Sequence, residues 1–125
     1  MIYGIGTDII AIGRIEALLA RYGDRFAKRI LAPAEWEAFR VSLSPARFLA
    51  KRFAAKEAFS KALGTGIRWP TSWHNIAIGH TALGRPRFDL GPALAKTLER
   101  EGIGGCHLSI SDEEELAVAF VVLER

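Results

Sequence analysis

The stretch from Leu116 to Leu123 constrains the fold of this chain most, because it is hydrophobic on both faces. Its residues, LAVAFVVL, include β-branched and aromatic side chains that favour a strand. Side chains along a strand point alternately to opposite sides, so both faces of this strand have to be covered. Either it lies centrally in its own sheet with helices on both sides, or a neighbouring subunit covers the second face.

The residues just before this strand predict its hairpin partner. Polar and apolar residues alternate from His107 to Ser111, so that His107, Ser109 and Ser111 line one face. Residues 112–114 form the turn. The polar face of the first strand therefore lies beside the hydrophobic return strand.

A strand is also expected at the beginning of the chain, from Ile2 to Ile10. Because the faces of a strand alternate, Gly4, Gly6 and Asp8 point to one side. Glycine has no side chain, so the side that carries the Asp8 carboxylate is nearly bare. We expect this free space to accommodate a ligand next to the carboxylate.

The longest helix is predicted over residues 45–64. Ser44 is a suitable N-cap, proline favours the first turn, and a glycine ends the helix. Glu57 and Lys61 are four residues apart within it, so their side chains lie on the same face. The glycines of Gly64-Thr65-Gly66 leave the backbone N–H groups there able to approach a ligand.

The other elements follow from periodicity and from breaking residues. A helix that begins at Ile12 is broken or kinked at Gly23, and Pro33 starts a short helix through Phe39. Further along, we predict a strand at 75–79, a turn and edge strand at 83–88, and a helix at 91–101. Together these elements predict an α+β fold, with helices packed on a small, mainly antiparallel sheet.

Asp8, Glu57 and Lys61 have the chemistry of a site for a divalent cation and a polyphosphate. Magnesium in proteins takes one or two carboxylates and leaves its other positions to phosphate oxygens and water. We therefore predict that Asp8 and Glu57 bind Mg²⁺ and that Lys61 contacts the phosphates as a positive charge. Taken singly, Glu57 and Lys61 would be an ordinary surface ion pair, and Asp8 a turn residue.

Composition limits the class of protein. A chain of 125 residues, 50% hydrophobic and 25% charged, is typical of one globular domain, residues 1–125. Its apolar runs are too short to span a membrane, and its N-terminus does not resemble a signal peptide. The single Cys106 excludes an intramolecular disulfide and fits a reducing compartment. We therefore expect a cytoplasmic protein.

The formal charge of +3 is distributed unevenly. Basic residues predominate from Arg14 to Arg29 and from Arg47 to Lys61, whereas acidic residues gather from Asp112 to Glu115. This asymmetry predicts an anionic partner. A nucleic acid, a nucleotide or an acidic protein would each meet that requirement.

Four blocks, in order along the chain, resemble the phosphopantetheinyl transferase family. They are Gly6-Thr7-Asp8 followed by Arg14, Lys56-Glu57-Ala58-Phe59-Ser60-Lys61, Gly84-Arg85-Pro86, and His107-Leu108-Ser109-Ile110-Ser111. The resemblance covers essentially the whole chain. It implies transfer of 4′-phosphopantetheine from coenzyme A to a serine of an apo acyl carrier protein, for fatty acid biosynthesis. Adenosine 3′,5′-bisphosphate would be released.

The resemblance also implies roles for individual residues. The catalytic residues would be Asp8, Glu57 and Lys61, the two carboxylates acting through Mg²⁺. Coenzyme A would be contacted by Arg52 at its 3′-phosphate and by Gly64, Arg85, Pro86, His107 and Ser109. Short family members resemble homotrimers with active sites between neighbouring chains, which favours a subunit interface on the two-sided strand. Asp112 stands where some members have a histidine, so the role that those members give to the histidine is not assigned to Asp112.

Acyl carrier proteins are acidic, and the first helical region carries suitable basic residues. Arg14, Arg21, Arg25 and Lys28 are spaced seven, four and three residues apart and form one stripe if the helix continues through Gly23. We expect this stripe to dock the carrier protein. A merely solvated basic face is the alternative.

Two other functions are consistent with the same composition. A basic chain with aromatic residues can be a nucleic-acid-binding module, although no nucleic-acid motif is present and Asp8 would have no purpose. A small Mg²⁺-dependent nucleotide hydrolase would use the same cation site without a protein acceptor. We expect neither a nucleic acid nor a membrane as partner.

Overall fold

The computed structural model describes residues 1–125 and has an α+β fold with two antiparallel sheets, which confirms the expected class. The larger sheet has the strand order β1-β5-β4, and the smaller one pairs β2 with β3. The strands are β1 (Ile2–Ala11), β2 (Ile76–His80), β3 (Pro86–Leu90), β4 (Gly105–Asp112) and β5 (Leu116–Glu124).

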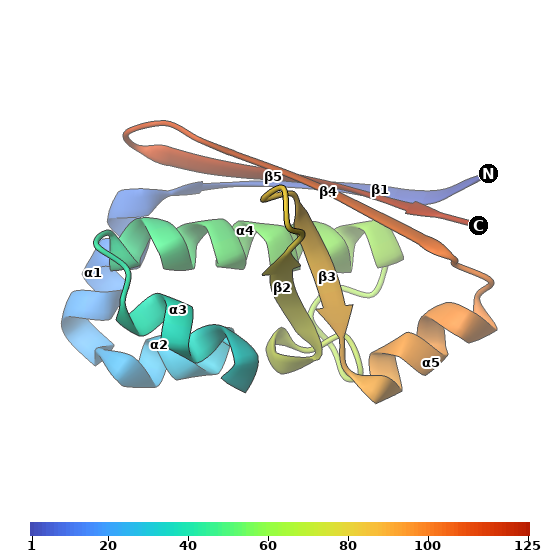
Figure 1. Ribbon diagram of the computed structural model, residues 1–125, viewed down its shortest axis with the longest axis horizontal. Helices are drawn as coiled ribbons and strands as arrows, with labels where there is room; N and C mark the ends of the chain where they lie inside the picture. The colour runs from blue at the N-terminus through green and yellow to red at the C-terminus, as the bar shows by residue number, and fades with distance from the viewer.

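The longest helix, α4 (Pro45–Leu63), runs along one face of the larger sheet (Figure 1). Three helices gather at one end of the molecule: α1 (Ile12–Tyr22), α2 (Asp24–Ile30) and α3 (Trp36–Arg40). At the other end lies α5 (Pro92–Arg100). Two short 3-10 turns, η1 (Pro33–Glu35) and η2 (Trp73–Asn75), occur in the connections. None of the helices has the length and apolar content needed to cross a membrane.

Small residues let α4 pack closely on the sheet. Its alanines Ala54, Ala58 and Ala62 are buried, as are Ala117 and Ala119 on β5. With small side chains on both surfaces, the helix and the strands approach one another while larger residues fill the margins of the core. The position of α4 relative to β1 and β5 is therefore set by backbone proximity.

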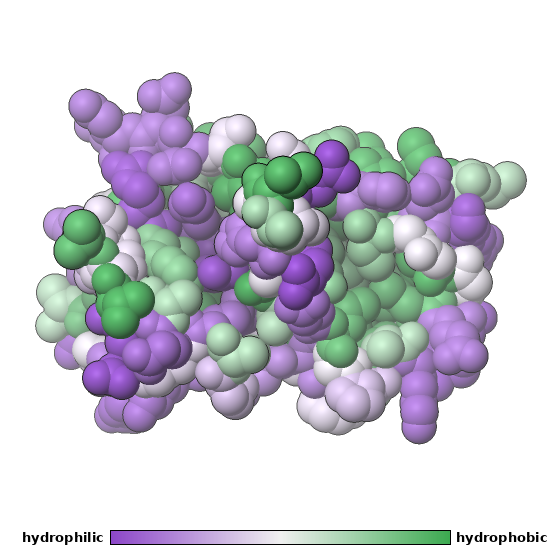
Figure 2. Space-filling model, viewed as in Figure 1, coloured by the Kyte–Doolittle hydropathy of each residue, from purple (hydrophilic) through white to green (hydrophobic).

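The two-sided strand β5 is central in the larger sheet, but a helix covers only one of its faces. Ala119, Val121 and Leu123 are buried, whereas Leu116 and Phe120 on the other face are exposed. Figure 1 shows no helix over that outer face. Figure 2 shows hydrophobic residues over the middle of the upper margin of the molecule, where the sheet lies, and hydrophilic residues at the left end of that margin. The strand is central in its sheet, but the helices on both sides that this alternative assumed are not present, so a neighbouring subunit stays the prediction for the second face.

The break predicted at Gly23 is confirmed, and one other boundary differs in detail from the prediction. Gly23 has φ 59° and separates α1 from α2, so the stripe that would require a continuous helix does not form. Ser44 occupies the N-cap position of α4, but its hydroxyl makes no capping hydrogen bond, and its own N–H donates to Ser42 Oγ at 3.1 Å. Proline at the first turn and a left-handed Gly64 at the C-cap are confirmed.

Candidate active site

Lys61 and Asp8 meet where α4 crosses β1. The Lys61 ammonium donates to Asp8 Oδ1 at 3.2 Å and to the backbone carbonyl of Thr7 at 2.9 Å. The Asp8 side chain is 16% exposed and that of Lys61 is 53% exposed. The contact therefore lies at the protein surface beside the junction of α4 and β1, where a ligand can reach it from solvent.

The bare face of β1 is filled by α4 and not by a ligand, which corrects the expectation drawn from Gly4 and Gly6. A Cβ added at Gly6 would lie 1.9 Å from the carbonyl oxygen of Ala58, and one at Gly4 would lie 2.0 Å from that of Ala62. Any side chain here would collide with helix backbone. The two glycines therefore allow the close approach that brings Asp8 to Lys61.

Glu57 lies one turn before Lys61 on the same helix and is half-buried. Burial raises the pKa of its carboxyl group, the nearby Asp8 carboxylate raises it further, and Lys61 opposes both. Two neighbouring carboxylates that repel each other create a demand for positive charge between them. No group of three or more His, Cys, Asp or Glu side chains converges as a metal site, so protein ligands here would be these two.

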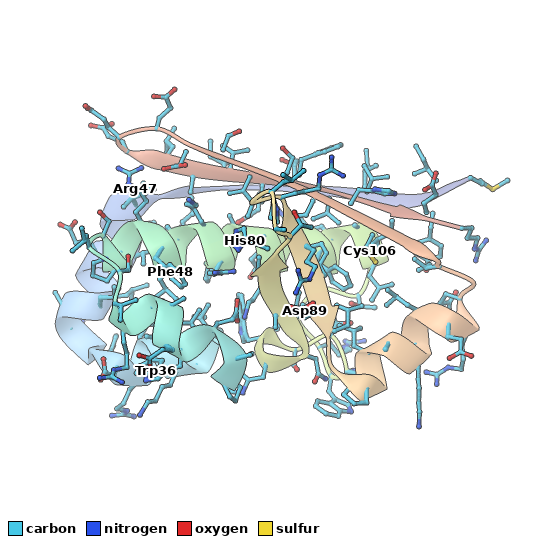
Figure 3. The ribbon with its side chains drawn as sticks, viewed as in Figure 1. Trp36, Arg47, Phe48, His80, Asp89 and Cys106 are labelled. Atoms are coloured by element: carbon cyan, nitrogen blue, oxygen red, sulfur yellow. The ribbon has the colours of Figure 1, made fainter.

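Arg52, which we expect to contact the 3′-phosphate of coenzyme A, is largely buried. Its guanidinium donates to the carbonyl of Ile78 at 2.7 Å, lies 3.6 Å from Glu35 Oε2, and stacks over the ring of Phe48. It also lines a small hollow of about 90 Å³ with Phe48, Lys51, His80 and Ile110. Figure 3 shows His80 beside α4. The guanidinium is therefore held in place by Ile78, Glu35 and Phe48 while it lines the hollow.

The hollow around Arg52 is strongly basic. Burial lowers the pKa of His80, and the positive charges of Arg52, Lys51 and Arg87 lower it further. Groups that depress the charge of a histidine in this way attract anions to the same place. An anionic group of a ligand is the physical complement of this hollow.

Gly64 and Gly66 follow α4 and are exposed, but their backbone donors are already engaged. Gly64 N–H donates to the carbonyls of Ser60 and Lys61, at 3.0 and 3.1 Å, and Gly66 N–H donates to Ser60 at 3.3 Å. Both glycines therefore cap the helix. The role of Gly64 toward a ligand stays a prediction.

The structure brings Arg85 and Pro86 together with His107 and Ser109. These four residues line a hollow of about 510 Å³ between β3 and β4, with Arg87, Cys106, Leu108 and Ile110. The His107 ring nitrogen lies 3.0 Å from Glu124 Oε1. Residues from separate blocks of the sequence thus form one concave, basic surface.

Asp8 and His107 nevertheless lie at opposite edges of the larger sheet. β5 separates β1 from β4, and Asp8 pairs with Ala119 on the face toward α4. His107 and Ser109 pair with Val122 and Phe120, on the outer face. Asp8 and His107 of one chain therefore point to opposite faces of the larger sheet.

The acidic turn after β4 is held by Arg47 of α4. Its guanidinium donates to Asp112 Oδ2 at 2.8 Å and to the carbonyls of Glu113 and Glu114 at 2.6 and 3.1 Å. In Figure 3, Arg47 points from the start of α4 toward this turn. Asp112 therefore serves as an anchor for the hairpin, a contact that the sequence does not reveal because the two residues are 65 apart.

The basic residues expected to dock a carrier, Arg14, Arg21, Arg25 and Lys28, are all exposed on α1 and α2. They belong to two helices because of the break at Gly23. Between these helices lies a hollow of about 390 Å³, lined by Leu18, Tyr22, Arg25, Phe26 and Arg29. The surface therefore combines an apolar floor with basic margins.

Sequence reasoning overlooked the buried pair of Glu35 and Lys56. Lys56 Nζ lies 2.6 Å from Glu35 Oε1, and both side chains are buried. Burial lowers the pKa of Lys56, and Glu35 opposes that shift. The available signal was the position of Lys56 directly before Glu57 in the Lys-Glu-Ala block.

Comparison with known proteins defines the class of this site. Residues 4–121 match the 4′-phosphopantetheinyl transferase superfamily, and the chain belongs to this family of transferases. It is 55% identical to a holo-[acyl-carrier-protein] synthase of Nitrosospira multiformis, over the full length of both chains.

Solved structures of holo-[acyl-carrier-protein] synthases have the same fold. The crystal structure from Neisseria meningitidis is 57% identical, with a TM-score of 0.97 over 100% of both chains. The structure from Bacillus anthracis, in complex with CoA (3′,5′-ADP), is 40% identical, with a TM-score of 0.81 over 98% of this chain and 96% of that one.

Proposed function

We propose that this chain transfers 4′-phosphopantetheine from coenzyme A to a serine hydroxyl of an apo acyl carrier protein. The serine oxygen forms a bond to the phosphorus on the pantetheine side of the pyrophosphate. The bond from that phosphorus to the bridging oxygen breaks, and adenosine 3′,5′-bisphosphate leaves with this oxygen. The serine proton is released. With such an acceptor, the reaction serves fatty acid biosynthesis, and we place it in the cytoplasm.

The observation that carries this proposal is the convergence of Asp8, Glu57 and Lys61 where α4 meets β1. Lys61 is an exposed cation, and its ammonium can exchange Asp8 for an oxygen of the coenzyme A pyrophosphate. Phosphoryl transfer depends largely on positioning and on neutralising charge, and these three residues supply both. The nucleic-acid module gives this group of residues no role.

Asp8 and Glu57 fit the requirements of Mg²⁺. Both are hard oxygen ligands, and burial together with the negative charge of Asp8 raises the pKa of Glu57. Bound there, Mg²⁺ would offset negative charge on the pyrophosphate of coenzyme A. Two carboxylates leave room for phosphate oxygens, as a substrate-completed site requires.

We further propose that coenzyme A binds between neighbouring chains of a homotrimer. The hollow of Arg85, Pro86, His107 and Ser109 suits a nucleotide, but within one chain the outer face of β4 points away from Asp8. A second copy seated on the exposed outer face of the sheet would bring its own Asp8 group near this hollow. Such an arrangement would also cover the hydrophobic residues of β5.

A mass measurement tests the reaction and separates it from nucleotide hydrolysis. Apo acyl carrier protein is incubated with coenzyme A, Mg²⁺ and this protein, and we expect its mass to rise by one phosphopantetheine group. A carrier with its acceptor serine replaced by alanine is the control. Asp8→Ala and Glu57→Ala should each lose most of the activity, because loss of a carboxylate that binds Mg²⁺ raises the activation free energy of phosphoryl transfer by roughly several kcal/mol. Coenzyme A cleavage without a mass change would indicate a hydrolase.

A further inference from the structure

Lys56 lies between the residues of the candidate active site in sequence but points into the interior. Its side chain is 0% exposed. The ammonium donates to the carbonyl of Ile30 at 2.6 Å, to Glu35 Oε1 at 2.6 Å and to the carbonyl of Trp73 at 2.9 Å. A lysine ammonium has three donors, and all three are used.

Glu35 is buried too, and both of its oxygens accept hydrogen bonds. Oε1 accepts from the backbone N–H of Ala32 at 2.9 Å as well as from Lys56. Oε2 accepts from the backbone N–H of Ile78 at 3.1 Å, and Arg52 lies 3.6 Å away. The pair thus ties α4 to the end of α2, to η1, to η2 and to β2.

The opposite side of α4 is held by β1. There the carbonyl oxygens of Ala58 and Ala62 lie against Gly6 and Gly4, where a Cβ would have no space. Consecutive residues of a helix are about 100° apart, so Lys56 and Glu57 face different neighbours. Any rotation of α4 that released Lys56 from Glu35 would also turn Glu57 relative to Asp8.

We propose that Glu35 and Lys56 are a positioning pair that sets the rotation of α4 and thereby holds Glu57 and Lys61 in register with Asp8. This inference rests on the proposed function, because it assigns the pair to the same site. Buried ion pairs contribute little net stability compared with apolar residues of similar size, but their hydrogen bonds demand one geometry. A cation site made of two carboxylates requires such a fixed geometry, because both carboxylates have to face the same ion.

The test compares Lys56→Met and Glu35→Gln with Leu49→Ala. Leu49 is fully buried on the same helix, two turns before Glu57, so its truncation destabilises the protein while both side chains of the pair stay in place. Glu35→Gln keeps the volume and one carbonyl acceptor, and is the variant to use if Lys56→Met does not fold. All measurements are made well below the melting temperature and normalised to the folded fraction from circular dichroism.

Two readouts besides activity report on positioning. Crystal structures of the variants give the distance from Lys61 Nζ to Asp8, and paramagnetic resonance titration gives the affinity for Mn²⁺ with coenzyme A present. We expect Lys56→Met and Glu35→Gln to lose the Lys61–Asp8 contact and to bind Mn²⁺ about tenfold or more weakly. Leu49→Ala should keep both at wild-type values.

A variant of the pair that keeps the wild-type contact, or binds Mn²⁺ as tightly as the wild type, would overturn the inference and reduce the pair to a stability role. The Lys61–Asp8 distance can be measured whether or not the chain transfers phosphopantetheine. An inactive wild-type protein would therefore count against the proposed function alone, while the structures of the variants still decide the role of the pair.

Discussion

At the scale of single residues, the missing side chain of Gly6 has more influence on the site than most side chains have. The backbone carbonyl oxygen of Ala58 occupies the place that a Cβ of residue 6 would take, and a backbone atom of a helix cannot move aside as a flexible side chain can. Asp8 follows two residues later on the same face of β1, so the distance between strand and helix determines how closely Asp8 approaches Lys61. The absence of a side chain at Gly6 thus affects the contact between the charged groups of Asp8 and Lys61.

We therefore expect Gly6→Ala to damage activity out of proportion to stability. Overpacking costs about 1–3 kcal/mol of unfolding free energy. A displacement of reacting groups by an ångström can lower the rate on the order of a hundredfold. Thermal melting and transfer kinetics measure the two effects. Gly13→Ala on α1 is the control, because nothing lies within 4 Å of a Cβ there. Wild-type activity of Gly6→Ala would contradict this explanation.

At the scale of elements, the break at Gly23 decides how basic charge is presented. Arg14 and Arg21 belong to α1, whereas Arg25 and Lys28 belong to α2, and the hollow with Leu18 and Phe26 lies between them. A partner with an acidic rim and an apolar ridge would contact both helices. Two helices meeting at a glycine offer a concave surface, which a single straight helix cannot.

Charge reversal on these helices should weaken the binding of the acyl carrier protein without affecting the binding of coenzyme A. We expect Arg21→Glu or Arg25→Glu to raise the KM for the carrier roughly tenfold at low ionic strength, because these exposed charges act on encounter. The effect should diminish as salt screens the charges. Coenzyme A affinity, measured by calorimetry, should not change. Lys96→Glu on α5, at the other end of the molecule, is the matched control. If the kinetics with the carrier protein were unaltered, α1 and α2 would have only a structural role.

At the scale of the whole molecule, the outer face of the larger sheet exposes large hydrophobic side chains to solvent. Ile5, Ile9 and Phe120 are 59%, 61% and 45% exposed on that face. Cross-strand pairing places them beside Val122, Val118 and Thr7, so they form a continuous patch. Patches of this kind on a small chain mark interfaces.

We expect the wild-type protein to sediment as a trimer and Phe120→Asp to dissociate it. Phe120 is already exposed in one chain, so the aspartate should disturb the interface and leave the fold of the chain intact. Loss of activity should accompany dissociation if the site is shared between chains. Val41→Asp, an exposed position outside the sheet, should change neither. An active wild-type monomer at nanomolar concentration would refute the shared site.

The pattern of local residues predicted most of the elements, because that information lies within a few residues. Glu57 and Lys61 share a helix face as their spacing of four requires, and the glycines that end α1 and α4 both have a positive φ. The alternation of Gly4, Gly6 and Asp8 also placed all three on one face of β1. Short-range periodicity therefore determined which side chains could act together within each element.

Only the tertiary structure decided what each face meets. The bare face of β1 receives α4, Arg52 turns inward to Ile78 and Glu35, and Lys56 finds Glu35 across 21 residues of sequence. The order β1-β5-β4 separates Asp8 from His107, although both stand in strands that the sequence predicts. Such contacts depend on how elements pack in three dimensions, and no local spacing encodes the distance between two segments that the chain brings together only on folding.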